Sequence, residues 1–238
     1  SGGNYNVVVG DEAGTAISTG DENTAVGYTA LDALNTGQYN VAIGKAALGA
    51  DTKGSQSVAV GTNALQTQNF TSSTNSLNTA VGYYAGQAVT TALENTLIGG
   101  FAGDAITTGN SNTAVGKSAL SAATTGTLNV AIGKDALRDN TTAGANTAVG
   151  TVSMRLNTTG ASNTAVGYGS LDTNTTGGSN VAIGRDSLTA NTTASNNTAV
   201  GYLSLSANTT GASNVAVGYA SLNTNTTGAQ NIGVGQGA

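Results

Sequence analysis

Residues 163–179 read NTAVGYGSLDTNTTGGS and residues 180–196 read NVAIGRDSLTANTTASN, and this pair of seventeen-residue units decides the fold. The same five-residue pattern ends in a glycine fourteen times in the chain. It consists of Asn (Ser in one unit), then Thr or an aliphatic residue, then usually Ala, then Val or Ile, and then the glycine. These repeat glycines are seventeen residues apart, except that Gly61 and Gly82 are separated by 21, which is four more than the period. Fixed spacing of this kind predicts one small structural unit stacked many times rather than a globular fold.

The residues around each repeat glycine have the composition of a short β-strand. The segment Thr-Ala-Val-Gly-Tyr at 164–168 is rich in β-branched residues and is bounded by Asn, so we expect a strand of four or five residues. A second extended stretch is expected around the Leu that lies four residues after the glycine, and Asn-Thr-Thr-Gly at 157–160 predicts a turn. No stripe with a period of 3.6 residues is present, which argues against a helix.

The predicted fold is therefore an all-β, parallel β-solenoid of about 14 coils with 17 residues each. We expect a single repeat domain over residues 1–238, with the four-residue insertion lying within 66–77. The Val or Ile before each repeat glycine, the Ala before that, and the Leu of the second stretch are expected to form buried apolar columns.

Asparagine recurs four residues before the repeat glycine in 13 of 14 units, and Ser57 is the exception. In stacked strands kept in register, such residues can form a ladder in which each side-chain amide bonds to the next. A row of glycosylated or ligand-binding residues is the alternative, but the position beside a buried strand favours the structural ladder. The ladder is predicted from Asn23, Asn40, Asn78, Asn112, Asn129, Asn163, Asn180 and Asn214.

The Leu column contains three glycines, and each is followed three residues later by an aliphatic residue, which indicates compensation within the coil. These pairs are Gly14 with Ile17, Gly86 with Val89, and Gly103 with Ile106. In the later units that second position is Asn, first at Asn140, and it begins an Asn-Thr-Thr sequence. This sequence matches the acceptor pattern for N-glycosylation and is equally typical of a turn.

The composition excludes several classes of function. The chain has no Cys and no His, which removes disulfides, thiolate chemistry and His-based catalysis or zinc binding. A net charge of −5 argues against a nucleic-acid partner, and no apolar run is long enough to embed the chain in a membrane. We expect no enzymatic activity and no cofactor.

A thin coil with one Leu and one Val or Ile buries little apolar surface for seventeen ordered residues. The chain would gain stability if another face of each coil packed against neighbouring chains. We therefore predict a homo-oligomer, with a trimer favoured, and end-to-end stacking of subunits as a further form of self-association.

Three segments of the repeat look like known proteins. Residues 40–47, NVAIGKAA, and 57–64, SVAVGTNA, resemble the head repeats of trimeric autotransporter adhesins, and 163–168 with the following Asn-Thr-Thr-Gly resembles repeats of phage tail fibres. The resemblance covers nearly the whole chain and implies a left-handed parallel β-roll, assembled as a trimer and exposed on a cell or virion. The repeat is longer than that of the adhesin heads, and no stalk, neck or anchor is recognisable.

The expected function is that of an extracellular structural fibre or adhesin-type repeat protein that presents a binding surface. The alternative is a self-assembling extracellular filament subunit with a purely structural role. Such a protein would be located outside the cell, on a cell surface, a filament or a virion. A host-surface glycan or protein is the expected partner of the binding module.

Two places are candidates for binding. The residue after the repeat glycine is often Tyr, Lys or Arg, and flat rings in such a column suit sugar faces, although cation–π contacts would make it a stabilising ladder instead. Phe70 in the insertion would be either a contact residue on a loop or a cap over a local defect. The column consists of Tyr168, Arg185, Tyr202 and Tyr219.

Acidic residues near the start of the chain form a third group with two interpretations. They could hold a calcium ion or could form a solvated acidic end, and their spacing matches no recognised calcium-binding loop. The group consists of Asp11, Glu12, Asp21 and Glu22.

Overall fold

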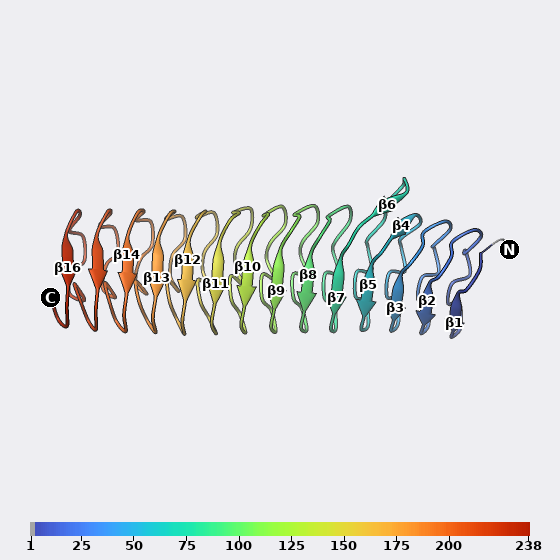
Figure 1. The fold of residues 1–238 in the computed structure, drawn as a ribbon, viewed down its shortest axis with the longest axis horizontal. Helices are drawn as coiled ribbons and strands as arrows, with labels where there is room; N and C mark the ends of the chain where they lie inside the picture. Colours follow the sequence, from blue (N-terminus) through green and yellow to red (C-terminus); the bar gives the residue numbers. More distant parts are fainter. Residues whose placement is uncertain (1–2) are drawn as a thin grey trace. The chain divides into compact units, whose positions relative to one another are not determined.

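The computed structural model describes residues 3–238, which form a parallel β-solenoid of about 13 turns at a spacing of about 17 residues, with no helix among them. The sequence predicts about 14 coils, and the difference arises because fourteen repeated strands enclose one turn fewer. The chain forms two compact units, an N-terminal unit (Ser1–Ser118) and a C-terminal unit (Ala119–Ala238), and each is described by itself. Figure 1 shows the succession of strands and turns within each unit.

In the N-terminal unit, neighbouring repeated strands pair in parallel, each with the next along the chain. Its seven repeated strands are β1 (Val7–Val9), β2 (Thr24–Val26), β3 (Val41–Ile43), β5 (Val58–Val60), β7 (Thr79–Val81), β8 (Thr96–Ile98) and β9 (Thr113–Val115). The additional strands are β4 (Gly54–Ser55) and β6 (Thr74–Asn75).

The C-terminal unit has the same construction without additional strands, and every paired residue is seventeen positions from its partner. Its strands are β10 (Val130–Ile132), β11 (Thr147–Val149), β12 (Thr164–Val166), β13 (Val181–Ile183), β14 (Thr198–Val200), β15 (Val215–Val217) and β16 (Ile232–Val234).

The insertion lies where the sequence places it and leaves the main register intact. Val58 of β5 pairs with Thr79 of β7, so this step alone spans 21 residues. The extra residues extend the coil outward as the parallel pair of β4 and β6, in which Gly54 lies beside Thr74. In Figure 1 this pair projects from the edge of the unit opposite to the carboxyl ends of β5 and β7.

The repeated strands are three residues long, shorter than predicted, because each repeat glycine turns the chain directly after the strand. Gly184 has a φ of +131°, a value that residues with a Cβ rarely adopt. The glycine of the next coil also lies against it: a Cβ on Gly184 would approach the backbone oxygen of Gly201 to 2.5 Å. Glycine is thus required both for the backbone angle and for the close stacking of the coils.

The Val and Ile residues before the repeat glycines are on the outer face, which corrects the prediction that they are buried. In β13, Ala182 is buried, whereas Ile183 is 40% exposed. Side chains alternate between the two faces of a strand, so the residue that is buried is the middle one, and it is small because the coil is narrow. The apolar interior is formed instead by the Ala column and the Leu column.

The predicted second extended stretch is also wrong, since the residues around Leu form turns. Leu171, Leu188 and Leu205 have φ values of 53°, 50° and 52°, in the left-handed region. This conformation costs about 1–2 kcal/mol for a residue with a side chain, a cost of the same order as the gain from burying a Leu completely. The tight turn aims each Leu into the coil.

Where the Leu column contains glycine, residues of the neighbouring columns fill the space. Val89 and Ile106 are buried, as the sequence predicts. Leu97, which stands where most units have Ala, contributes as well: a Cβ on Gly86 or on Gly103 would lie 2.7 Å from one of its methyl carbons. The compensation therefore operates between coils as well as within one coil.

Candidate binding surfaces

The Asn residues before the strands form a buried ladder in each unit. The side-chain oxygen of Asn163 accepts the backbone N–H of Asn180 at 2.9 Å and its amide N–H at 3.1 Å. The same amide of Asn180 also donates to the backbone oxygen of Ala194 at 2.9 Å. Of the eight residues predicted for the ladder, Asn23, Asn40, Asn78, Asn112, Asn129, Asn163, Asn180 and Asn214, all are buried. They form part of the interior.

A second Asn ladder lies in the C-terminal unit, at the first residue of each Asn-Thr-Thr sequence. The amide of Asn174 donates to the side-chain oxygen of Asn157 at 2.8 Å, and the amide of Asn191 donates to that of Asn174 at 2.8 Å. Each also bonds to the backbone oxygen three residues further on, as Asn157 does to Gly160 at 2.9 Å. Because the side chains from Asn140 to Asn208 are buried, the folded chain presents these residues as turn residues and not as glycosylation sites, and only Asn225 of this row is partly exposed.

The predicted surface column is brought together in the C-terminal unit by the turn that follows each repeat glycine. The guanidinium carbon of Arg185 lies 5.8 Å from the ring centre of Tyr168 and 5.8 Å from that of Tyr202. The rings of Tyr202 and Tyr219 are 5.6 Å apart and tilted by 44°. Arg185 also pairs with Asp186 at 3.1 Å. These contacts favour a stabilising ladder, since its members mainly contact one another.

A second aromatic group, which the sequence reasoning missed, lies in the N-terminal unit. It is formed by Tyr83, Tyr84 and Phe101 and is called the aromatic cluster below. The ring centres of Tyr83 and Tyr84 are 4.2 Å apart, and Phe101 lies 5.4 Å from Tyr83 and 5.7 Å from Tyr84. A signal was available: Tyr84 and Phe101 occupy the same position in successive units, one period apart.

Phe70 lies in the interior rather than at the tip of a loop. It is 6% exposed, its backbone N–H donates to a carboxylate oxygen of Asp51 at 3.2 Å, and its carbonyl accepts the Thr52 hydroxyl at 2.9 Å. Of the two alternatives for Phe70, this placement favours the cap over a local defect. Residues 71–73 of the insertion are polar and exposed, and Leu77 near its end is an apolar residue that is 52% exposed.

The defect itself is the break in the Asn ladder at Ser57, which a buried polar network repairs. The Gln68 side chain accepts from the amide of Asn78 at 2.9 Å and donates to Ser57 at 2.8 Å and to Asp51 at 2.7 Å. Asp51 also accepts the backbone N–H of Gly54 at 2.9 Å. The insertion is thus integrated into the core by a chain of hydrogen bonds that ends on a carboxylate, which can only accept.

The acidic residues of the first coils contact other groups. Glu12 lies beside Tyr28, and its negative charge, followed by burial and a hydrogen bond to Glu12, raises the pKa of that phenol. Asp21 accepts the backbone N–H of Asn4 at 2.6 Å. Within residues 3–238, no three His, Cys, Asp or Glu side chains are grouped so that they could hold a metal ion.

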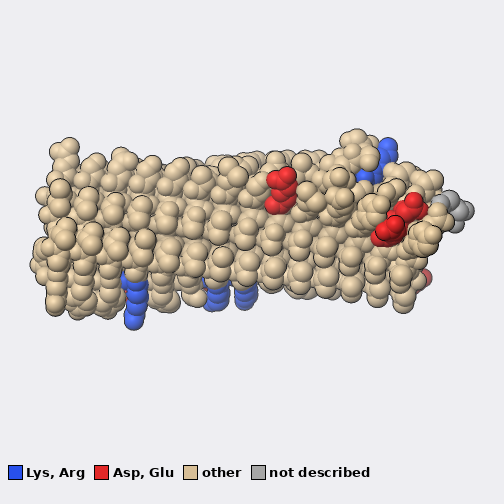
Figure 2. Space-filling model, in the orientation of Figure 1, with Lys and Arg blue, Asp and Glu red and all other residues tan. Residues whose placement is uncertain are grey.

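Charged side chains are sparse, and Figure 2 shows that most of the visible surface carries none. In the C-terminal unit Arg155 and Asp172, one period apart, share two hydrogen bonds of 3.1 Å. Burial raises the pKa of the Asp172 carboxyl, an effect that Arg155 partly offsets. The hydrogen bond from Arg138 to Asp139 raises the pKa of that guanidinium. Arg155 thus pairs with Asp172, and Arg138 with Asp139.

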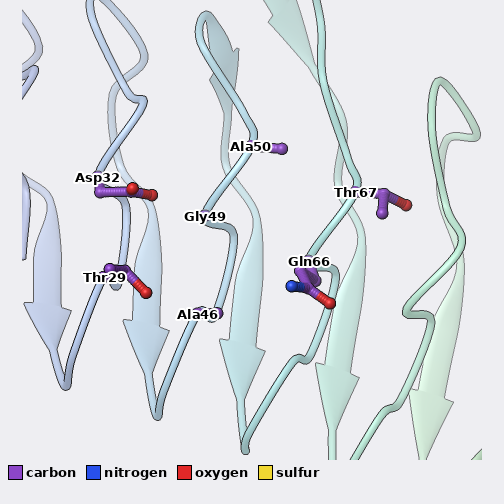
Figure 3. Close-up of a pocket in the computed structure, with 7 residues that line it drawn as sticks. All are labelled: Thr29, Asp32, Ala46, Gly49, Ala50, Gln66 and Thr67. Carbon is purple, nitrogen blue, oxygen red and sulfur yellow. The ribbon is translucent and has the colours of Figure 1, made fainter.

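A shallow hollow of about 360 Å³ lies in the N-terminal unit, on the side of the coils shown in Figure 3. It exists because Gly49 and Ala50 carry little or no side chain between the larger Asp32 and Gln66 of the neighbouring coils. One carboxylate, one amide and two hydroxyls line it, with no cation. The lining residues are Thr29, Asp32, Ala46, Gly49, Ala50, Gln66 and Thr67.

One carboxylate of the N-terminal unit should make stability depend on pH. Burial raises the pKa of the Asp104 carboxyl above its ordinary value of 3.8, and one of its oxygens is buried without a hydrogen-bond partner. The folded state therefore binds this proton more tightly than the unfolded state. The resulting stability is fully present below pH 3.8 and is lost as the pH rises through the raised pKa.

We expect Asp104→Asn to raise the thermal unfolding midpoint at pH 7 and to leave it nearly unchanged at pH 3, as measured by circular dichroism. Asp104→Gln should behave in the same way, because Gln87 occupies this position in the preceding coil. An equal gain at both pH values would mean that the charge of Asp104 is not the cause.

Comparison of the chain with protein-family models, with curated proteins and with solved structures finds no match. Within residues 3–238, no helix is long and apolar enough to cross a membrane.

Proposed function

We propose that the chain is part of an extracellular structural fibre of the adhesin or tail-fibre type, which assembles as a homo-oligomer, with a trimer favoured, and presents binding surfaces. The observation that carries the proposal is the outer stripe, which is the series of Val and Ile residues directly before the repeat glycines within each unit. The resemblance of 40–47 and 57–64 to adhesin head repeats supports the trimer, the left-handed β-roll and the extracellular location.

The outer stripe has the character of a contact surface. Ile132 and Ile183 are each 40% exposed, and the outward residues two positions earlier in the repeated strands are Thr, Val or Ile. The repeated strands contain no charged residue, so a continuous uncharged face runs along each unit. Contiguous exposed apolar residues of this kind mark interaction sites.

A second copy of the same chain is the partner that fits the outer stripe best. Stripes of several copies have the same spacing between coils, so in a trimer the Val and Ile residues of three copies can interdigitate around a common axis along the whole contact. Packing of this kind would supply the apolar burial that a narrow coil with an Ala interior lacks.

The proposal is tested by sedimentation and native mass measurement of the chain and of the double variant Ile132→Thr, Ile183→Thr. The wild type should have three times the chain mass of 23.0 kDa, and the double variant should dissociate into folded single chains. Threonine is compatible with an outward position, since Thr147 and Thr164 face outward in β11 and β12. Lys134→Thr, which lies outside the stripe and matches Thr151 of the next unit, is the control.

A wild-type chain that is folded and monomeric at high concentration would overturn the proposed oligomer. Electron microscopy of the same sample distinguishes a module that presents binding surfaces from a purely structural filament subunit. Short rods of fixed length are expected for a presenting module, and filaments of indefinite length would instead support the purely structural filament subunit.

A further inference from the structure

The aromatic cluster is exposed and held in a defined arrangement. Tyr83 is 52% exposed and Phe101 is 36% exposed. The rings of Phe101 and Tyr84 are nearly parallel, at 27°, and Tyr83 meets Phe101 edge-on at 80°. The backbone beneath them is fixed between coils: the N–H of Tyr84 donates to Thr62 at 3.0 Å and that of Phe101 to Tyr83 at 2.9 Å. An incoming ligand would meet rings that are already positioned.

The neighbouring coils show that the three rings are not needed to build the turns. The position of Tyr84 and Phe101 is held by Ala46 and Asn63 in the two preceding units. All four residues have a positive φ, between 54° and 60°, where large side chains are uncommon. Two aromatic residues in succession at such a position add a surface that the turn itself does not require.

The space beside the cluster is open. Gly100 stands at the position that Tyr83 occupies in the preceding unit, and apart from its chain neighbours Gly99 and Phe101 the only atom within 4 Å of a Cβ there would be the backbone oxygen of Tyr83, at 3.9 Å. Gly100 itself therefore contributes no side chain between Tyr83 and Lys117, which occupy the same position in the preceding and following units. A flat ligand lying on the rings would have room next to Gly100.

The cluster combines an apolar platform with hydroxyl groups at one edge. A hydrogen bond between the phenols of Tyr83 and Tyr84, followed by burial, raises the pKa of Tyr83, so the two hydroxyls lie side by side. Thr62 and Asn63 of the preceding coil add further neutral polar groups. In the five units from residue 45 to residue 118, neither of the two residues that directly follow the repeat glycine is Asp or Glu.

We infer that the aromatic cluster is a binding site for a glycan built of hexopyranose units. A pyranose ring has an apolar face of C–H groups that can lie on an aromatic ring and a rim of hydroxyls that can bond to phenols and amides. A peptide that binds by adding a strand would require unpaired backbone partners at a strand edge, which the bonded coils here do not offer. This inference rests on the proposed role of the chain as a fibre that presents surfaces, and it specifies the class of ligand and the place.

The inference is tested with the full chain on an array of neutral and acidic hexopyranose oligosaccharides, followed by titration of the best-bound oligosaccharide. Binding should be about tenfold weaker or more in Tyr83→Thr and in Phe101→Ser. Both variants should fold, because Thr62 and Ser118 occupy the same positions in nearby units. The control is Tyr28→Thr, an exposed Tyr of the same column outside the cluster, for which binding should be unchanged.

Absence of binding to any oligosaccharide on the array would overturn the inference, and so would equal binding by wild type and both cluster variants. An equal loss in Tyr28→Thr would show that binding is spread along the column instead. Sedimentation of the same samples separates this result from the proposed function. If glycan binding is absent but the oligomer is intact, only the inferred glycan site is contradicted. If the wild type is monomeric, the proposed fibre is contradicted.

Discussion

Gly184→Ala is expected to destabilise the C-terminal unit by about 3–5 kcal/mol. The Cβ would lie 2.5 Å from the backbone oxygen of Gly201 and 2.7 Å from its carbonyl carbon, and neither atom belongs to a side chain that could move aside. The φ of +131° at Gly184 is a second obstacle, because residues with a Cβ rarely adopt it. Urea-induced unfolding followed by circular dichroism measures the loss.

Gly178→Ala, in the preceding coil, is the matched control. Ala161 occupies the same position one period earlier, and a Cβ on Gly178 would lie 3.1 Å from the backbone oxygen of Ala161, a tight contact but a longer one than the 2.5 Å at Gly184. The free energy of unfolding should change by less than about 1 kcal/mol and could increase, because alanine restricts the unfolded chain. Equal effects of the two substitutions would contradict the argument that close stacking at the repeat glycines limits the sequence.

The second large effect is expected for Asn180→Ala, which should lower the free energy of unfolding by about 3–5 kcal/mol. The substitution removes the acceptor of the Asn197 backbone N–H, at 3.0 Å, and the donor to the Ala194 carbonyl, at 2.9 Å. Both partners are inside the coil, where water cannot replace the lost bonds without opening the structure. Each buried polar group left without a partner costs about 1–3 kcal/mol.

The neighbouring substitution Ser179→Ala serves as the control for Asn180→Ala. Ser179 is exposed and has a φ of 57°, and Ala145 takes the same position with a φ of 58° in an earlier coil. Its effect should be smaller than about 0.5 kcal/mol. If both variants unfold at the same urea concentration as the wild type, the Asn ladder contributes little to stability.

Much of the fold could be predicted because each unit repeats the same short sequence pattern, with a strand-forming segment followed by a glycine. The repeat glycine with its positive φ ends every strand, and the equal spacing then determines which residues pair, as Val181 with Thr198. The step from Gly61 to Gly82 located the insertion for the same reason. Strand length was overestimated, because the turn at the glycine begins one residue earlier than β-propensity suggests.

The prediction that the Val and Ile residues of the strands are buried was wrong, because the more hydrophobic residue is here the exposed one. Ile183 is far more apolar than Ala182, yet Ala182 is the residue inside. The narrow coil admits only a small side chain at this position, and Leu188 fills the rest of the interior. The alternation of Thr164 and Val166 on one face, with Ala165 on the other, was the available signal.

The candidate sites were predictable only where residues one period apart were compared. Tyr168, Arg185 and Tyr202 were recognised in this way, and their contacts follow the column. Tyr84 and Phe101 satisfy the same criterion one position later in the unit. The network of Gln68 with Ser57 and Asn78 could not be foreseen, because it depends on how the insertion folds back into the core.

The two Asn ladders of the C-terminal unit have a consequence for its electrostatics. In both, side-chain amides of later residues donate to the oxygens of earlier ones, as Asn180 does to Asn163 and Asn174 to Asn157, whereas the side-chain nitrogen of Asn197 has no hydrogen-bond partner. The amide dipoles in both rows therefore point in the same direction and add, whereas those of neighbouring peptide groups in a β-sheet largely cancel. The unit acquires an electrical polarity along the stacking direction, with an orientation set by the direction of the chain.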